Sequence, residues 1–282
     1  MEMPTLGKAF TTLKRRAVVY VFACAILILF VNVILELMLG LPSDVSSHLG
    51  ILAGGLLGWK CYSYENPGWK LSAQRRDFHW IVPLTVLLLE WSLCNLISHL
   101  YGTIASVIIT LMNGDGGASP DNMPVADTLI MLIGAVVIAP FGEELIFRQC
   151  GTGLLKDAGS KWFALLFPTA LFSALHMNYG MQGILQVFTG GMIYALCYYY
   201  TENIFYSMLA HGAHNLMVSF RFTQIRGMYK YDLLQPVSLV TNLVMLAVGL
   251  FLLIRFVYPR EIKPARAAEH TRIAENTGKI PE

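Results

Sequence analysis

The segment EELIFR, residues 143–148, places two adjacent acids and an arginine after an apolar run that ends at Pro140. Ionisable groups inside apolar segments are costly, and they usually pair with one another or line a cavity, which makes them functional-site candidates. On a helix with 3.6 residues per turn, Glu144 and Arg148 share one face and can form an ion pair, whereas Glu143 points about 100° away. Glu143 is therefore available as a general base.

Two later apolar segments carry further polar groups. The segment FSALH, residues 172–176, ends in His176, and the segment HGAHN, residues 211–215, places His211 and Asn215 on one helical face, with His214 beside them. An imidazole and a carboxamide that project together can donate two hydrogen bonds to one oxygen atom. An oxyanion-stabilising site requires this arrangement.

Each of these residues also has a purely structural explanation. A lone buried histidine is more often a hydrogen-bonded core residue than a catalyst, and the Glu144–Arg148 pair can serve folding alone. Together, however, an acid, two histidines and an asparagine on three apolar segments carry more energetic cost than packing requires. The set as a whole indicates an active site.

The composition shows what must hold these groups in place. Of 282 residues, 55% are hydrophobic and only 13% are charged, which is typical of a polytopic integral membrane protein. The net charge of +2 and the absence of a Lys/Arg-rich block exclude nucleic acid as an expected partner.

Hydropathy predicts an all-α fold of about eight transmembrane helices that surround an intramembrane catalytic cavity. We expect Pro140 to kink or break the fourth helix just before the acids, and we interpret residues 104–112 as an interfacial or re-entrant piece after the third. The expected spans are approximately 17–40, 46–63, 79–102, 126–148, 162–178, 182–200, 203–220 and 236–258.

The chain reads as one membrane domain, residues 17–258, between two polar ends. Residues 1–16 form a basic N-terminal arm before an uncleaved first span, and residues 259–282 form a polar tail that we expect to be flexible or to lie on the surface. A segment rich in Gly, Pro and Asp, residues 113–124, separates three spans from five.

Basic residues predict the orientation, because Lys and Arg concentrate on the cytoplasmic side. They place both termini in the cytoplasm, and the compact size with short loops indicates a bacterial plasma membrane. The loop that contains Arg221, Arg226 and Lys230 disagrees with this assignment. The supporting residues are Lys8, Lys14, Arg15, Arg16, Lys60, Lys70, Arg75, Arg76, Lys156, Lys161, Arg260, Lys263 and Arg266.

The second span carries Gly50, Gly54 and Gly58 at four-residue spacing, which lets a neighbouring helix approach closely. Packing within the chain is the simpler interpretation, and a homodimer through these glycines is the alternative. The five cysteines lie in or beside apolar runs without a C-x-x-C pair, so we interpret them as packing residues.

The order E-E-x-x-x-R, F-x-x-x-H and H-x-x-x-N resembles the CAAX protease and bacteriocin-processing family, also called the ABI family. Here the motifs are EELIFR (143–148), FSALH (172–176) and HGAHN (211–215), and they place the protease core at about residues 126–216. The resemblance implies an eight-span intramembrane glutamic endopeptidase related to the Ras-converting CAAX proteases. Its substrate would be a membrane-associated peptide or protein.

The resemblance also implies the role of each residue. Glu143 would activate the attacking water with help from His176, His211 and Asn215 would stabilise the oxyanion, and Glu144 with Arg148 would support them. We expect no cofactor. The alternative is zinc held by Glu143, His176 and His211 with water in the open position, but that arrangement leaves no obvious base.

Two questions remain at this stage. In a plain up-and-down arrangement Glu143 and His176 would lie at opposite membrane depths, so either the fourth helix continues past Arg148 or the fifth begins deeper. The rival function is a non-catalytic protein of the same fold, in bacteriocin self-immunity or as a scaffold or chaperone. A transporter is disfavoured because we find one expected helix break and no repeat of it.

Overall fold

The computed structural model describes residues 6–70, 78–111, 132–159, 161–224 and 234–277, and all secondary structure within these ranges is helical. The predicted all-α fold is therefore confirmed. Each of the eight predicted apolar segments coincides with a helix, including the continuous helix over residues 132–157, which we call the central helix. The others are α1 (Leu6–Leu39), α2 (Ser43–Glu65), α3 (Ile81–Leu111), α7 (Lys161–Ala174), α8 (Gly180–Thr201), α9 (Ile204–Gln224) and α10 (Leu234–Leu252).

Three helices in the described part of the chain are long and apolar enough to cross a membrane. They cover Thr11–Leu39, Ile81–Ile104 and Leu239–Glu269, and they make the chain an integral membrane protein. The predicted count of eight spans is not confirmed. One reason is length, since the apolar helix α7 has only 14 residues.

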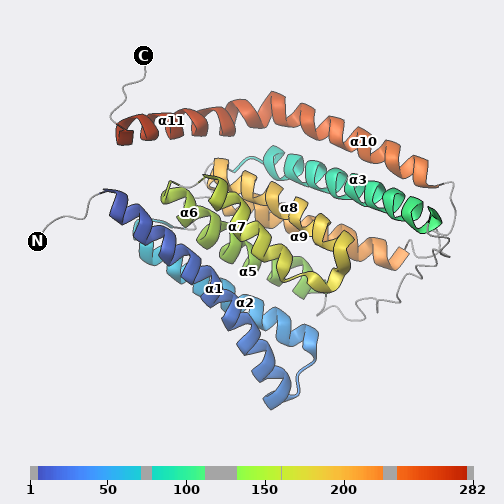
Figure 1. Cartoon of the computed structure of the whole chain (residues 1–282), viewed down its shortest axis with the longest axis horizontal. Helices are drawn as coiled ribbons and strands as arrows, with labels where there is room; N and C mark the ends of the chain where they lie inside the picture. Colours follow the sequence, from blue (N-terminus) through green and yellow to red (C-terminus); the bar gives the residue numbers. More distant parts are fainter. Residues whose placement is uncertain (1–5, 71–77, 112–131, 160, 225–233, 278–282) are drawn as a thin grey trace, which may run out of the picture.

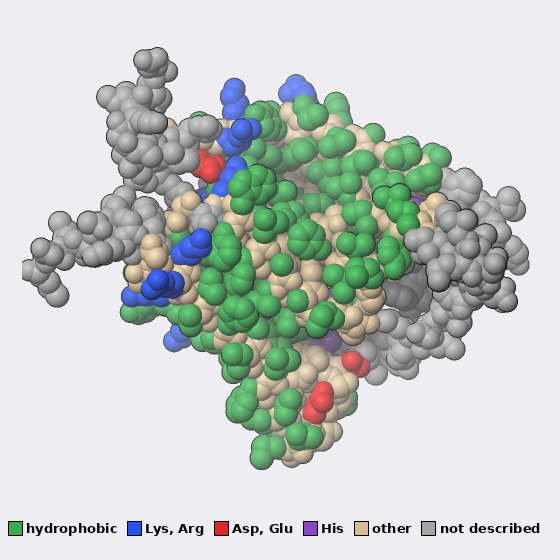
Figure 2. All heavy atoms as spheres, viewed as in Figure 1, with side chains coloured by type: hydrophobic (Ala, Val, Ile, Leu, Met, Phe, Trp, Pro, Cys, Tyr) green, Lys and Arg blue, Asp and Glu red, His purple; other side chains and the backbone are tan. Residues whose placement is uncertain are grey.

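The helices form two outer pairs around a central group. In Figure 1, α1 and α2 run side by side on one flank, α3 and α10 on the other, and the central helix, α7, α8 and α9 lie between them. Figure 2 shows hydrophobic side chains over much of the visible surface, with Lys and Arg mostly toward the side where α1 begins. The apolar surface suits a protein in a lipid bilayer.

The central helix is built from alternating helical types. A π-helical turn, η2 (Gly134–Ile138), is followed by α5 (Ala139–Glu143), a second π-helical stretch, η3 (Glu144–Gly153), and α6 (Leu154–Asp157). Pro140 was expected to kink or break the helix, and the break is wrong, because the widened turns of η2 carry the helix past the proline. Glu143 consequently lies near the middle of a long helix that continues beyond Arg148, which is one of the two ways in which Glu143 and His176 can reach the same depth. The kink stays an untested prediction.

One further expectation is corrected. Residues 104–111 are not a separate re-entrant piece but the last turns of α3. After α10 the chain continues through η5 (Leu253–Ile262) into α11 (Lys263–Thr277), so the described part of the tail is helical, and its predicted flexibility stays untested. Alanine and long polar residues favour this helix, and Tyr199 anchors it by donating a 2.8 Å hydrogen bond to Glu269. The segment 113–124 lies outside the described residues.

The glycines of α2 serve packing within the chain. A Cβ on Gly50 would come within 2.8 Å of the Ile28 carbonyl oxygen in α1, and one on Gly58 would lie 3.2 Å from the Leu145 carbonyl oxygen in η3. Gly54 is also buried against α1. These contacts account for all three glycines, and a homodimer through them stays an untested prediction. The cysteines are free thiols and four of the five are buried, as expected of packing residues.

Candidate active site

The two acids lie at the junction of α5 and η3, in the most enclosed part of the central helix. Every residue from Glu144 to Gly153 is buried, and Glu143 is only 8% exposed. Arg148 Nε lies 3.3 Å from Glu144 Oε2, so the ion pair predicted from the i, i+4 spacing is confirmed. Arg148 also donates from Nη2 to the Gly191 carbonyl oxygen over 3.3 Å. The guanidinium thus ties the central helix to α8.

His211 lies between the two acids. Its Nδ1 donates to Glu144 Oε1 over 3.0 Å, and its Nε2 lies 3.6 Å from Glu143 Oε2. Glu144 therefore has two partners, Arg148 and His211, whereas His211 provides the one ion-pair contact described for Glu143. The unequal neutralisation expected from helical geometry is present, and the more weakly held carboxylate is Glu143.

Aromatic rings enclose this group of charges. The Arg148 guanidinium carbon lies 4.6 Å from the centre of the Phe172 ring and 5.5 Å from that of Tyr194, at cation–π distances. Tyr194 stacks on His211 with ring centres 5.0 Å apart. A Cβ on Gly191 would lie 3.1 Å from Phe172 and 3.4 Å from Arg148 Nη2, so the absence of a side chain there lets the guanidinium approach α8.

Asn215 donates to a backbone carbonyl, that of Ala135, which the π-turn and Pro140 leave without a partner inside its own helix. Its Nδ2 donates to the Ala135 carbonyl oxygen over 2.8 Å. In an α-helix that carbonyl would accept from the N–H of Ala139, but in η2 this N–H donates to Gly134 instead. Pro140 has no N–H to replace it. Asn215 thus satisfies an acceptor that would otherwise lack a partner.

His176 lies where α7 ends, half-buried beside Phe172. Its Nδ1 donates to the Phe172 carbonyl oxygen over 2.8 Å, so a neutral ring presents Nε2 as an acceptor. The Phe172 ring contacts both histidines, with centres 4.7 Å from His176 and 6.0 Å from His211. The structure thus joins Glu143, Glu144, Arg148 and His211 directly, while His176 and Asn215 adjoin this group through Phe172 and the backbone.

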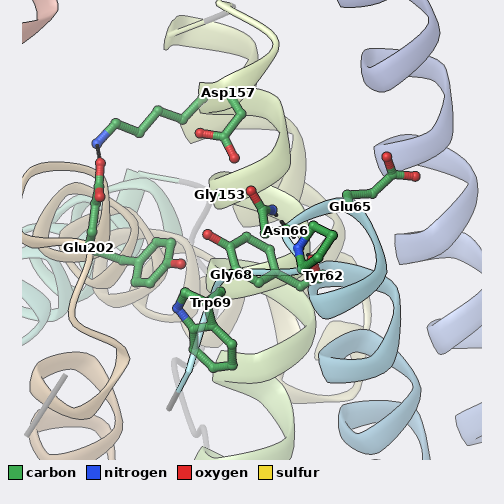
Figure 3. Close-up of a pocket in the computed structure, with 11 residues that line it drawn as sticks. Tyr62, Glu65, Asn66, Gly68, Trp69, Gly153, Asp157 and Glu202 are labelled. Atoms are coloured by element: carbon green, nitrogen blue, oxygen red, sulfur yellow. Dashed lines mark hydrogen bonds and ion pairs between the residues drawn. The ribbon is translucent and has the colours of Figure 1, made fainter. Parts of the chain in front are cut away.

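The expected cavity around the acids is not confirmed. A cavity of about 480 Å³ lies instead at the end of α2, beside α6 and the turn between α8 and α9. Figure 3 shows Tyr62, Trp69, Asp157 and Glu202 around it.

The zinc alternative requires Glu143, His176 and His211 to meet around one ion. Within the described ranges, no three His, Cys, Asp or Glu side chains gather closely enough to hold a metal ion. Nδ1 of His176 faces a carbonyl and Nδ1 of His211 faces Glu144. These contacts leave Nε2 of each ring available, so the zinc alternative stays an untested prediction, and no step below is routed through a metal.

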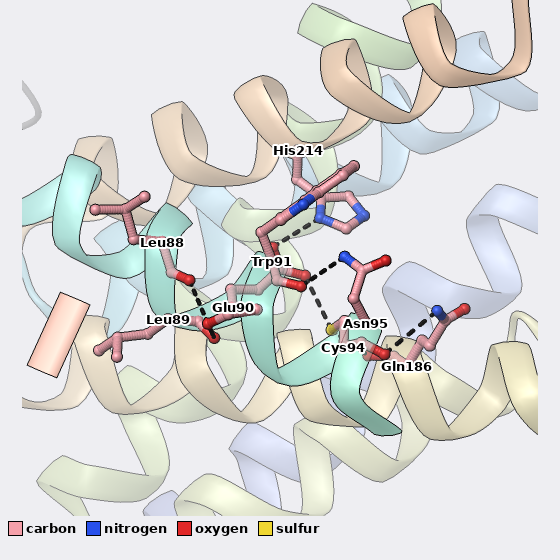
Figure 4. Close-up of polar contacts among 9 residues, drawn as sticks. Leu88, Leu89, Glu90, Trp91, Cys94, Asn95, Gln186 and His214 are labelled. Atoms are coloured by element: carbon pink, nitrogen blue, oxygen red, sulfur yellow. Dashed lines mark hydrogen bonds and ion pairs between the residues drawn. The ribbon is translucent and has the colours of Figure 1, made fainter. Parts of the chain in front are cut away.

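One buried charge pair was missed at the sequence level. Glu90 of α3 is 2% exposed, and His214 donates from Nδ1 to its Oε2 over 2.7 Å (Figure 4). An isolated acid within the apolar run IVPLTVLLLEWSLCNL carries the same signal as Glu143 and Glu144. Its partner lies 124 positions away, which sequence spacing does not reveal.

Comparison with known proteins agrees with the motif set. The family model described as type II CAAX prenyl endopeptidase Rce1-like matches residues 125–217, which include all three motifs and every candidate site residue. That segment is about a third of the chain.

A curated relative and a structural search complete the comparison. The Bacillus subtilis (strain 168) protein named "Putative membrane peptidase YdiL" is 26% identical over 133 residues, which are 45% of this chain and 54% of that protein. The alignment therefore spans about half the length of the relative. No solved structure gives a significant match.

Proposed function

We propose that this chain, which belongs to the CAAX protease family, is an intramembrane endopeptidase in which Glu143 activates water. The observation that carries the proposal is the unequal pairing of the two acids. Glu144 is neutralised by Arg148 and His211, whereas the ion-pair contact described for Glu143 is with the second nitrogen of His211, at 3.6 Å. A weakly paired carboxylate in a buried site is suited to accept a proton.

In the proposed reaction, Glu143 takes a proton from water as the oxygen attacks the carbonyl carbon of the scissile peptide bond. The unprotonated Nε2 of His176 accepts a hydrogen bond from the same water. The resulting oxyanion accepts hydrogen bonds from His211 and from the second N–H of Asn215, whose first N–H stays on Ala135. The C–N bond then breaks, and the leaving amine takes its proton from Glu143.

His211 can serve the oxyanion because of its position beside Glu144. As an imidazolium it donates from Nδ1 to Glu144 and from Nε2 toward Glu143 or the substrate oxygen. The carboxylate of Glu144 stabilises the positive ring, and Arg148 holds that carboxylate in place. Glu144 and Arg148 therefore act through His211 and have no direct contact with the reacting atoms in this proposal.

The proposed substrate is a membrane-associated peptide or protein, either of the CAAX type or a bacteriocin or other peptide precursor. It is handled in a bacterial plasma membrane with both termini of the enzyme cytoplasmic. Two quenched fluorescent peptides with the same sequence test whether the substrate is of the CAAX type. One carries a farnesyl group on the cysteine of a C-terminal CAAX sequence, and the other has a free thiol. Cleavage of the farnesylated peptide alone supports the CAAX class.

The test of activity itself compares the membrane peptidomes of cells that contain the wild type or Glu143→Gln. General-base catalysis contributes typically 10²- to 10⁴-fold, so we expect the variant to lose at least about 100-fold in cleavage rate. Glu36→Gln is the matched control, because Glu36 lies in α1 outside the matched segment. Identical peptidomes for the wild type and Glu143→Gln would instead favour the non-catalytic immunity or scaffold function.

A further inference from the structure

Glu90 forms the centre of a polar network that connects α3 to α8 and α9. One carboxylate oxygen accepts from His214 over 2.7 Å and the other from the Cys94 thiol over 3.2 Å. The same thiol lies 3.3 Å from the Gln186 carbonyl oxygen in α8. In Figure 4, Glu90, Trp91 and Cys94 of α3 lie beneath the His214 ring of α9. A buried carboxylate is tolerated because this network satisfies it.

The α3 members of the network, Glu90 and Cys94, lie outside the segment that the family model matches, since α3 ends at Leu111 and the match begins at residue 125. The network nevertheless contacts the third motif directly through His214. Within HGAHN, His211 contacts Glu144, His214 contacts Glu90, and Asn215 contacts the Ala135 carbonyl. One turn of α9 is thus attached to η3, α3 and η2 at the same time.

These three attachments determine how α9 is rotated about its own axis. His211 and His214 are three residues apart, so they project about 60° from each other, and a rotation that moves one ring moves the other. On the side of η2, a Cβ on Gly212 would lie only 2.7 Å from the Val136 carbonyl oxygen, so α9 cannot shift toward it. The Glu90–His214 contact provides the opposing attachment on the side of α3.

α8 brings the Glu90 network close to the active site. Gly190 admits Glu90, whose Oε1 would lie 2.8 Å from a Cβ there, and the next residue, Gly191, admits Arg148. One turn further along, Tyr194 stacks on His211. The adjacent Gly190 and Gly191 of α8 thus leave space for Glu90 of the network and for Arg148 of the candidate active site.

We propose that Glu90 and His214 are positioning residues that hold α9 at the rotation in which His211 faces Glu143 and Glu144. The inference rests on the proposed protease function. It extends the functional unit to α3, outside the motif-bearing segment. Neither residue touches the substrate in this proposal, and each acts through the orientation of His211 and Asn215.

The test measures kcat and KM for whichever of the two quenched peptides the wild type cleaves. A misplacement of about 1 Å can cost 10²-fold in rate, so we expect Glu90→Gln to lower kcat about 10- to 100-fold with KM within about twofold of wild type. We expect Glu90→Asp, which keeps the charge on a shorter side chain, to recover part of the loss. The double variant Glu90→Gln/His214→Gln should lose no more than the worse single variant.

Ser98→Ala is the matched control. Ser98 lies two turns after Glu90 in α3 and accepts a hydrogen bond from Gln186 of α8, so the substitution weakens α3 packing without touching α9. A merely structural role for Glu90 predicts similar losses of thermal stability and activity in both variants. Wild-type kcat in Glu90→Gln overturns the proposal. If that variant does not fold, wild-type kcat in His214→Gln overturns it.

Failure of the proposed function gives a different result. If the wild type and Glu143→Gln cleave equally or not at all, the protease assignment fails, and hydrogen–deuterium exchange then tests the positioning separately. Faster exchange in residues 204–217 of Glu90→Gln, with Ser98→Ala unchanged, supports the attachment of α9 by Glu90. Unchanged exchange in that segment overturns it.

Discussion

α9 carries two carboxylate–histidine centres, one on each of two faces, and they differ in how their acids are paired. At His214 one acid, Glu90, faces one imidazole, and the ring is about a quarter exposed. At His211 two acids face one imidazole and one guanidinium, with Glu144 and Arg148 almost completely buried. Both centres therefore have as many acids as bases, but the centre at His211 places two adjacent acids within one buried group.

This difference separates a site that holds structure from a site that is suited to chemistry. The pairing at Glu90 leaves no acid without a close partner, which is what positioning requires. At His211 the second acid, Glu143, is 3.6 Å from a ring that already donates to Glu144. A buried acid without a strong partner lowers the stability of the fold. Such an acid is therefore the one expected to act on a substrate.

The largest expected effect on stability comes from removing Arg148, the guanidinium that holds Glu144 in place in the proposed mechanism. Arg148→Ala leaves Glu144 buried with one partner fewer, and breaking a buried ion pair typically costs about 3–5 kcal/mol. We expect a loss of that size in the free energy of unfolding, measured by denaturant titration in mixed micelles. Arg16→Ala, whose half-exposed guanidinium pairs with Glu65, is the control and should cost less than about 1 kcal/mol.

A double variant makes the comparison sharper. If Glu144 and Arg148 neutralise each other, Glu144→Ala/Arg148→Ala should cost clearly less than the sum of the two single substitutions. Additive costs would mean that the two side chains contribute independently, and the division of roles between Glu143 and Glu144 would lose its basis.

The next effect tests how tightly α9 is held between the two centres. On Gly212, a Cβ would lie 2.7 Å from a backbone oxygen, Val136 O, which cannot move without the helix. Overpacking of this kind costs about 1–3 kcal/mol, so Gly212→Ala should be destabilised by that amount and should lose activity. Gly190→Ala is its partner variant, because the Cβ there meets only the end of the Glu90 side chain. Equal destabilisation of the two variants would contradict the rigid contact.

The sequence predicted those features that depend on local periodicity. Apolar runs located a helix at each of the eight predicted segments, and the spacing of Glu144 and Arg148 predicted their ion pair. The end of the central helix was misplaced because residues after Arg148, such as Gln149 and Thr152, are polar. They are buried by neighbouring helices, not by lipid, so hydropathy does not mark them.

Features that depend on distant partners could not be predicted in the same way. The Asn215 contact requires both the π-turn in η2 and the missing N–H of Pro140. The helix propensities of single residues do not predict this combination. The polar composition of the tail does not reveal a distant partner, yet Glu269 of α11 accepts a hydrogen bond from Tyr199 of α8. In both cases the decisive group lies tens of residues away.

The smallest expected effect concerns the thiol that completes the centre at Glu90. Cys94 donates to Glu90 Oε1 over 3.2 Å, and a typical hydrogen bond contributes about 0.5–1.5 kcal/mol. Cys94→Ala should therefore lower the free energy of unfolding by about that amount, and kcat should fall only a few-fold because His214 still holds the carboxylate. Cys94→Ser keeps a donor at this position and should recover most of the loss. A Cys94→Ala effect on kcat as large as that of Glu90→Gln would show that α9 is held by the whole network and not by the single contact between Glu90 and His214.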